Sequence, residues 1–382
     1  MSLTLTFLGA AGGVTGSCFA LETETGAVLI ECGLFQGSKS EKELNYRAFP
    51  FDVRKIAACL LTHAHIDHAG LIPKLVKAGF RSAIHATPAT IDLASVMLPD
   101  SGYIQETEVA FLNRRNARRG RNSVEPIYTA HDAHVSLDRF VAHPYREWFD
   151  VIPGTRARFW NAGHLLGSAS IEIETRAGAD TIRLLFSGDL GPDERLLHPD
   201  PEAPRDFDIV VCESTYGDTD RLDSSTAARR KLLCQEIRAA RNPNGVVLIP
   251  SFAVERTQEL LVDLVGAMRA GDVASIPIFF DSPLASRATT VFAAQARGLE
   301  NGGDLLAALR APEVRFTESV EASKALDKQT GFHIVLAASG MCEAGRIRHR
   351  LENWLWREEA TVLFVGFQAQ GTLGRILRDG AE

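Results

Sequence analysis

Hydrophobic and polar positions in the first half of the chain follow the pattern of β-strands joined by short turns. The strands predicted from period-two alternation or from short apolar runs span residues 3–8, 18–21, 27–31, 56–61, 156–160, 170–175 and 181–186. The pair 18–21 and 27–31 should form a hairpin across residues 22–26. Apolar residues at helical spacing between 71 and 76 predict a helix that ends near Gly79.

From Asp208 onward the pattern changes to alternating strands and helices. The predicted strands span 209–212, 246–249, 276–280, 333–337 and 361–365, and the predicted helices span 225–240, 254–268 and 285–296. Such alternation is typical of a parallel α/β sheet. A chain of 382 residues is long enough for two or three domains. We therefore expect one domain over residues 1–205 and a second over residues 206–382.

Composition and charge restrict the class of protein. The chain is 45% hydrophobic and 23% charged, and its formal net charge is -7, so any contact with nucleic acid would have to use local basic patches. The six cysteines are scattered without a Cys-x-x-Cys pair, which favours reduced thiols in a cytoplasmic protein. The sequence has neither the basic start of a signal peptide nor an apolar run of membrane-spanning length, so no membrane partner is expected.

The most informative segment follows the buried strand at 56–61. It contains His63, His65, Asp67 and His68 within six positions. Imidazole and carboxylate ligands together suit zinc and similar divalent ions. Side chains alternate along a strand, so His63 and His65 should point the same way, while a turn brings Asp67 and His68 toward a second ion.

Two later fragments also place a metal-type ligand directly after a strand. His164 follows Asn161-Ala162-Gly163, and Asp189 follows Ser187-Gly188. With the earlier cluster they offer six ligands, enough for two ions if one carboxylate, Asp189, bridges them. Two ions about 3.5–4 Å apart can support hydrolysis of a phosphodiester.

These residues resemble the pattern of the metallo-β-lactamase superfamily, and later motifs resemble its β-CASP branch of RNA-processing nucleases. The segments that carry the resemblance are 12–17, 31–37, 62–68, His164, Asp189, 213–217, 252–256, 281–283 and 338–341. The histidine cluster marks the superfamily, and the motifs after residue 205 mark the branch. The resemblance implies an α/β protein, with a metallo-β-lactamase αββα sandwich and a second α/β β-CASP domain of parallel sheet type.

The resemblance also implies roles for single residues. His63, His65 and His164 would hold a first zinc ion, Asp67 and His68 a second, and Asp189 would bridge them, with Asp67 and Asp189 also positioning the nucleophile. Glu213 matches a carboxylate that orients a general-acid histidine in the family. The implied activity is zinc-dependent cleavage of single-stranded RNA by an endo- or exonuclease. We also expect a cytoplasmic protein that can form a homodimer.

The chain departs from the family pattern at two places. Glu31 stands where the family has an aspartate that orients a ligand, so we expect a weakened rather than broken site. No histidine motif of the family type follows residues 371–374, where the family has a general acid and a further ligand of the second zinc. We therefore expect the sequence to be the N-terminal part of a longer protein, with an incomplete second metal site.

Several other patterns admit two interpretations. His131 and His134 should lie on a solvated helix face capped by Thr129 rather than bind metal. The arginine run between 114 and 121 is either a phosphate contact or a solvated helix face. Ser339 and Gly340, before a helix expected to open at Met341, form either a phosphate site or a plain turn.

Two alternative functions remain open from the sequence. One is a small-ester or thioester metallohydrolase of the same superfamily, which the later motifs disfavour. The other is a degenerate RNA-binding scaffold subunit, which Glu31 and the missing histidines favour and the six metal ligands disfavour.

Overall fold

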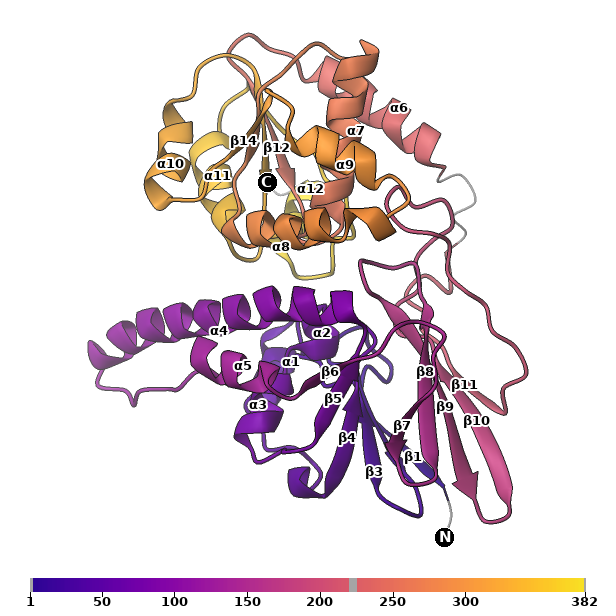
Figure 1. Cartoon of the computed structure of the whole chain (residues 1–382). Helices are drawn as coiled ribbons and strands as arrows, with labels where there is room; N and C mark the ends of the chain where they lie inside the picture. The colour runs from indigo at the N-terminus through magenta and orange to yellow at the C-terminus, as the bar shows by residue number, and fades with distance from the viewer. Residues whose placement is uncertain (1–2, 220–224, 381–382) are drawn as a thin grey trace. The chain divides into compact units, whose positions relative to one another are not determined.

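The computed structural model describes residues 3–219 and 225–380, which form two compact units (Figure 1). The first unit contains Met1–Asp193 and Asp200–Asp218, and the second contains Glu194–Pro199 and Thr219–Glu382. Six residues, Glu194–Pro199, therefore belong to the second unit although the chain returns to the first unit after them. In the described part of the chain, no helix is both long and apolar enough to cross a membrane.

The first unit contains a six-stranded sheet with the order β1-β2-β3-β4-β5-β6. Its strands are β1 (Thr4–Gly9), β2 (Cys18–Glu22), β3 (Ala27–Ile30), β4 (Ile56–Leu60), β5 (Ala83–Ala86) and β6 (Phe140–Ala142). The first three strands are antiparallel and include the predicted hairpin, whereas β3 to β6 run parallel. The parallel strands bring the carboxyl ends of β3 and β4 to the same edge of the sheet.

The second sheet of this unit has five strands in the order β11-β10-β9-β8-β7. They are β7 (Phe149–Ile152), β8 (Thr155–Asn161), β9 (Ala169–Ala177), β10 (Asp180–Phe186) and β11 (Ile209–Val211). Strand β11 pairs parallel with β10, although the sequence rhythm assigned it to the sheet of the following domain. That assignment was wrong, because the apolar pattern of a three-residue strand does not specify which sheet it joins.

The core of the first unit lies between the two sheets. Leu21, Ile30 and Leu60 from one sheet pack in the same buried cluster as Ile171 and Phe186 from the other. Burial of each such side chain stabilises the fold by roughly 2 kcal/mol. The two layers therefore hold the strand ends, and whatever side chains follow them, in fixed relative positions.

Helices cover the side of the six-stranded sheet that faces away from the second sheet (Figure 1). The helices of this unit are α1 (Lys39–Leu44), η1 (Val53–Lys55), α2 (Ile66–Ala69), α3 (Ile72–Lys77), α4 (Pro88–Ala117) and α5 (Ala130–Leu137). Helix α3 confirms the helix predicted between 71 and 79. Helix α5 begins with the capping box of Thr129 and Asp132, as the interpretation of His131 and His134 required.

The outer face of the five-stranded sheet carries charges and aromatic rings. Glu172 alternates along β9 with the core residues Ile171 and Ile173, and its carboxylate accepts hydrogen bonds from Arg158 at 2.6 Å, Trp160 at 2.7 Å and Arg183 at 2.7 Å. The carboxylate is buried, and these hydrogen bonds from two arginines and a tryptophan offset the cost of burying its charge.

The second unit is built on a parallel sheet with the order β14-β13-β15-β12-β16. Its strands are β12 (Val246–Pro250), β13 (Ile278–Phe280), β14 (Val314–Phe316), β15 (His333–Ala337) and β16 (Ala360–Val362). Its helices are α6 (Thr226–Ala239), α7 (Arg256–Ala270), α8 (Pro283–Ala294), η2 (Ala296–Gly298), α9 (Gly302–Leu309), α10 (Val320–Ala325), η3 (Leu326–Lys328), α11 (Arg346–Trp354) and α12 (Leu373–Arg378). The parallel sheet confirms the fold class predicted for this half.

One helix boundary in this unit was predicted wrongly. The helix expected to open at Met341 is α11, which begins at Arg346 after a turn that ends at Gly345. Ser339 Oγ accepts the backbone N–H groups of Glu343 and Ala344 inside that turn. Ser339 and Gly340 therefore do not lie at a helix N-terminus, and the hydroxyl of Ser339 is used as a hydrogen-bond acceptor within the turn.

Candidate metal centre

The six predicted metal ligands all follow the carboxyl ends of strands in the first unit. His63, His65, Asp67 and His68 come after β4, with the last two inside the short helix α2. His164 follows β8, and Asp189 follows β10. Strands of both sheets therefore contribute to one cluster.

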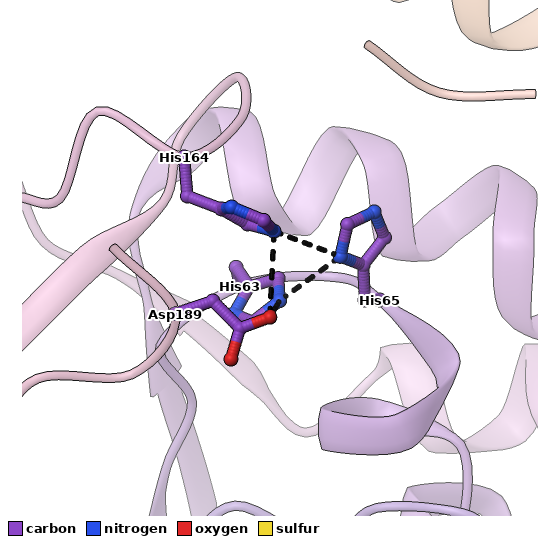
Figure 2. Close-up of side chains that lie close together, drawn as sticks. All are labelled: His63, His65, His164 and Asp189. Atoms are coloured by element: carbon purple, nitrogen blue, oxygen red, sulfur yellow. Dashed lines mark hydrogen bonds and ion pairs between the residues drawn. The ribbon is translucent and has the colours of Figure 1, made fainter. Parts of the chain in front are cut away.

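Four of these side chains converge on one point (Figure 2). The donor atoms of His63, His65, His164 and Asp189 all lie within 4.8 Å of one another. Nδ1 of His65 lies 3.1 Å from Nε2 of His63 and 3.2 Å from Nε2 of His164, and Oδ2 of Asp189 lies 3.5 Å from Nε2 of His164. Ligands about 2.1 Å from one tetrahedral ion are themselves about 3.4 Å apart. The spacing and the donor set both fit a zinc-type ion.

His68 and Asp67 lie beside this group. Nε2 of His68 is 3.2 Å from Oδ1 of Asp189 and 3.9 Å from Oδ2 of Asp67. This nitrogen is buried and has no hydrogen-bond partner among the described residues. A buried polar atom without a partner is costly, and this one is directed toward two carboxylates. Asp189 lies beside His68 and also beside His63 and His164.

Burial and neighbouring charges shift the pKa values of the histidines of this cluster in opposite directions. Burial lowers the pKa of His63 well below its usual value, and the neighbouring His68 lowers it further. Burial also opposes charge on His68, but Glu31, Asp67 and Asp189 raise its pKa well above the usual value. For Asp189, burial favours the neutral form, yet His68 holds the pKa of this carboxyl well below its usual range. At His68 the carboxylates thus outweigh the cost of burying a positive charge.

Glu31 orients His68 from behind. Its carboxylate is buried and accepts hydrogen bonds from Ser17 Oγ, from Thr62 Oγ1 and from Nδ1 of His68 at 2.7 Å. This contact fixes the ring so that its other nitrogen faces Asp189. Glu31, His63 and His68 also have ligand atoms within 4.8 Å of one another, but both Glu31 oxygens already accept hydrogen bonds. The side chain of Glu31 therefore reaches the histidine.

Backbone contacts hold the ligand-bearing loops. Ser17 N–H donates to Asp67 O at 2.9 Å, and Cys32 N–H donates to His68 O at 2.8 Å. A Cβ at Gly33 would lie 1.6 Å from Asp67 O, so only glycine fits there. Through Ser17, Cys32 and Gly33, the motifs at 12–17 and 31–37 thus contact helix α2 and hold it in place.

The loops of His164 and Asp189 are fixed by residues that sequence reasoning missed or assigned otherwise. The buried hydroxyl of Ser168 accepts the N–H groups of His164 at 3.0 Å and Leu165 at 3.1 Å. Glu213, which follows β11, accepts the N–H of Leu190 at 3.1 Å and that of Thr215 at 3.0 Å. Within the described residues Glu213 therefore holds the residue after Asp189. In the sequence, the only indication of this role for Ser168 is its position four residues after His164.

A cavity of about 490 Å³ adjoins the cluster. The lining includes His68, Asp189, Glu31 and Glu213 together with the glycine-rich loop at residues 10–14. Ligands that are firmly held and yet reachable from a cavity are typical of a catalytic rather than a purely structural metal site.

The remaining candidates from the sequence lie elsewhere. Asp132 pairs with Lys77 at 3.0 Å, and neither His131 nor His134 belongs to a metal-type cluster within residues 3–219 and 225–380. The arginines between 114 and 121 are exposed around the end of α4. Ser339 and Gly340 belong to the second unit, whereas all six ligands belong to the first.

Comparisons with known proteins agree with this geometry. A family model of the metallo-beta-lactamase superfamily matches residues 11–232, and a Beta-Casp domain model matches residues 257–377. Ribonuclease TTHA0252 of Thermus thermophilus is 35% identical over 96% of this chain and 79% of its own length. The transcription termination factor FttA of Methanosarcina mazei is 30% identical over 98% of this chain, which spans only 58% of that protein.

A solved structure shows the same fold along the chain. A protein of unknown function from Enterococcus faecalis V583 covers 96% of this chain and 88% of its own length, with a TM-score of 0.51 at 10% identity. The resemblance read from the motifs is confirmed by the two family models and by the relatives. The chain therefore belongs to the metallo-β-lactamase superfamily and carries a β-CASP domain.

Proposed function

We propose that this protein is a metal-dependent ribonuclease that hydrolyses phosphodiester bonds of single-stranded RNA in RNA processing. The observation that carries the proposal is the convergence of His63, His65, His164 and Asp189 beside a cavity, in a chain whose relatives include a protein named as a ribonuclease. The chain spans 58% of the termination factors and 79% of the Thermus ribonuclease, so the activity of the whole protein is part of this proposal.

The proposed ligands divide between two zinc ions. His63, His65 and His164 would hold the first, Asp67 and His68 the second, and Asp189 both. A divalent ion in such a site polarises a phosphoryl oxygen and lowers the pKa of water. Distances between the donor atoms support this division, and the hydrogen bond from His68 to Glu31 supports the orientation of the second group.

The chain's own groups would do the rest of the chemistry. Asp67 and Asp189 would position the attacking water, since both carboxylates are partly exposed toward solvent. Glu213 would keep Asp189 in place through the backbone of Leu190. The location in the cytoplasm and the homodimer remain predictions from the sequence.

Incubation of the chain with end-labelled single-stranded RNA, with Zn²⁺ or with a chelator, tests the proposal. We expect cleavage that the chelator abolishes and that His63→Ala with His65→Ala also abolishes, while His131→Ala serves as the matched surface control. Less than one tightly bound metal ion per chain, unchanged in the His63 and His65 variant, would refute the metal centre. RNA binding without cleavage would favour the scaffold alternative, and hydrolysis of thioesters without RNA cleavage the small-substrate alternative.

A further inference from the structure

Residues Glu194–Pro199 form a strap that belongs to the second unit, while the residues on both sides of it belong to the first. Leu196 and Leu197 are buried, with exposed fractions of 8% and 0%. A segment that only connected two units would stay at the surface. The burial of the strap therefore calls for a reason.

The strap is held by side chains of the second unit. Nε2 of His198 lies 2.6 Å from Oε2 of Glu255, and both residues are buried. Asn301 donates to Leu196 O at 2.5 Å, and the N–H of Glu300 donates to Leu197 O at 3.2 Å. A buried hydrogen bond of this length between an imidazole and a carboxylate is a strong contact.

Glu255 is itself held in an unusual backbone conformation. Its φ of 70° is rare for any residue with a side chain, and it stands directly before helix α7. Strained conformations persist where the surroundings over-determine them, and they concentrate at sites with a task. The carboxylate of Glu255 faces His198 and, at 3.9 Å, Arg195, so both strap residues meet the strained position.

Both ends of the strap lead to the metal centre. Asp189 lies five residues before Glu194. In between, the N–H of Gly191 donates to Ala162 O at 2.8 Å, and a Cβ at Gly191 would lie 1.8 Å from Gly163 O. The segment between Asp189 and the strap is thus packed against Ala162 and Gly163, which precede His164.

The trailing end contacts the same loop. The N–H of Glu202 donates to Asn161 O at 2.8 Å, and Oε2 of Glu202 accepts the N–H of Asn161 at 3.1 Å. The side chain of Asn161 in turn accepts the N–H of Gly163 at 3.1 Å. Residues 161–163 are therefore held from both sides by the chain that leaves and re-enters the first unit.

We propose that His198 and Glu255 are positioning residues of the metal centre. They hold the strap, the segments directly before and after the strap contact residues 161–163 next to His164, and the segment before it contains Asp189. The inference rests on the proposed function, because it takes His164 and Asp189 as metal ligands. It assigns to the second unit an indirect role in metal affinity, because all six predicted ligands belong to the first unit.

A cobalt titration of the full chain tests this coupling without any RNA. We expect His198→Asn to weaken Co²⁺ binding at least about fivefold, the lower end of measured coupling between sites. The control is His333→Asn, since His333 is equally buried in the second unit and its imidazole contacts the backbone of Gly331, away from the strap. The control should bind Co²⁺ within twofold of the unaltered chain.

Hydrogen exchange provides a second measurement that needs no variant. Because coupling is reciprocal, Co²⁺ should slow amide exchange in residues 194–198 of the unaltered chain. Equal Co²⁺ affinity in the two variants, or exchange of the strap that Co²⁺ leaves unchanged, would overturn the inference. Failure of the unaltered chain to bind Co²⁺ would instead refute the proposed metal centre itself.

Discussion

Replacement of Glu31 by glutamine is the sharpest perturbation of the candidate metal centre. Glutamine has the same length and can still accept the hydrogen bonds of His68 and Thr62 at its carbonyl oxygen. Its amide nitrogen would then face Ser17, whose hydroxyl can rotate to accept. The substitution therefore keeps the contacts and removes the charge that makes Nε2 of His68 a strong ligand.

The expected magnitude follows from the type of contact that is lost. Removing the partner that orients a ligand histidine typically weakens metal binding about 10–100-fold, which corresponds to about 1.4–2.7 kcal/mol. In the metal-free chain, exchanging charge-assisted for neutral hydrogen bonds should lower the free energy of unfolding by about 1–3 kcal/mol.

Glu172→Gln is the matched control. Glu172 is also buried in the first unit and accepts four hydrogen bonds, but its partners are Arg158, Trp160 and Arg183 on the outer face of the other sheet. Both variants should lose stability, and only the Glu31 variant should lose metal affinity. Glu31→Asp keeps the charge but draws it back by one methylene, so its affinity should fall between those of the glutamine variant and the unaltered chain.

Competition for Zn²⁺ against a chromophoric chelator at pH 7.5 measures the affinities, and urea denaturation of the metal-free chains measures the stabilities. If Glu31→Gln binds Zn²⁺ as tightly as Glu172→Gln does, Glu31 does not orient His68 and the reasoning is wrong. An Asp variant that binds more tightly than the unaltered chain would contradict the reach argued for Glu31.

Three further predictions concern the rest of the molecule. Burial beside His143 lowers the pKa of His85 to about 4, so the unfolded chain binds this proton more readily and stability falls between pH 6.5 and about 4. That loss should reach about 2 kcal/mol at pH 5 relative to pH 8 in urea denaturation, and His85→Asn should reduce it. Arg350→Ala removes one of the two arginines that pair with the buried Asp281 carboxylate at 2.9 Å and leaves Arg346 in place, so it should cost about 1–3 kcal/mol in the same assay, against less than about 0.5 kcal/mol for exposed Arg348→Ala. His131→Ala should leave the Zn²⁺ affinity unchanged, and a loss would mean that the helix α5 histidines bind metal after all.

Much of the fold followed from the sequence because local patterns specified it. The alternation before Glu31 and the apolar run before His63 each predicted where a strand ends. In the structure β3 ends at Ile30 and β4 ends at Leu60. The sheet that β11 joins could not be predicted, because a partner strand is chosen by long-range packing that three apolar residues do not encode. The start of α11 was missed because residues 339–345 form a turn closed by a glycine with a φ of 77°.

The candidate site was predictable to the level of its proposed ligands and no further. Histidine and aspartate are metal-type ligands, and the structure brings the six predicted side chains close together. The hydroxyls of Ser17, Thr62 and Ser168 gave no such signal, because serine and threonine occur after strands for many reasons. Their hydrogen bonds to Glu31 and to the backbone at His164 depend on distances that only the folded chain sets.

The strap also dictates an order of events during synthesis. A ribosome releases all six ligands before it releases the strap, but Glu255 and Asn301 follow their strap partners by 57 and 105 residues. The two-sheet sandwich can therefore form on the nascent chain while the strap still lacks its binding partners. Because closing such long loops costs only slightly more entropy than closing short ones, the delay has little effect on final stability. Its effect is kinetic, since the docking of residues 194–199 must wait for the later part of the chain.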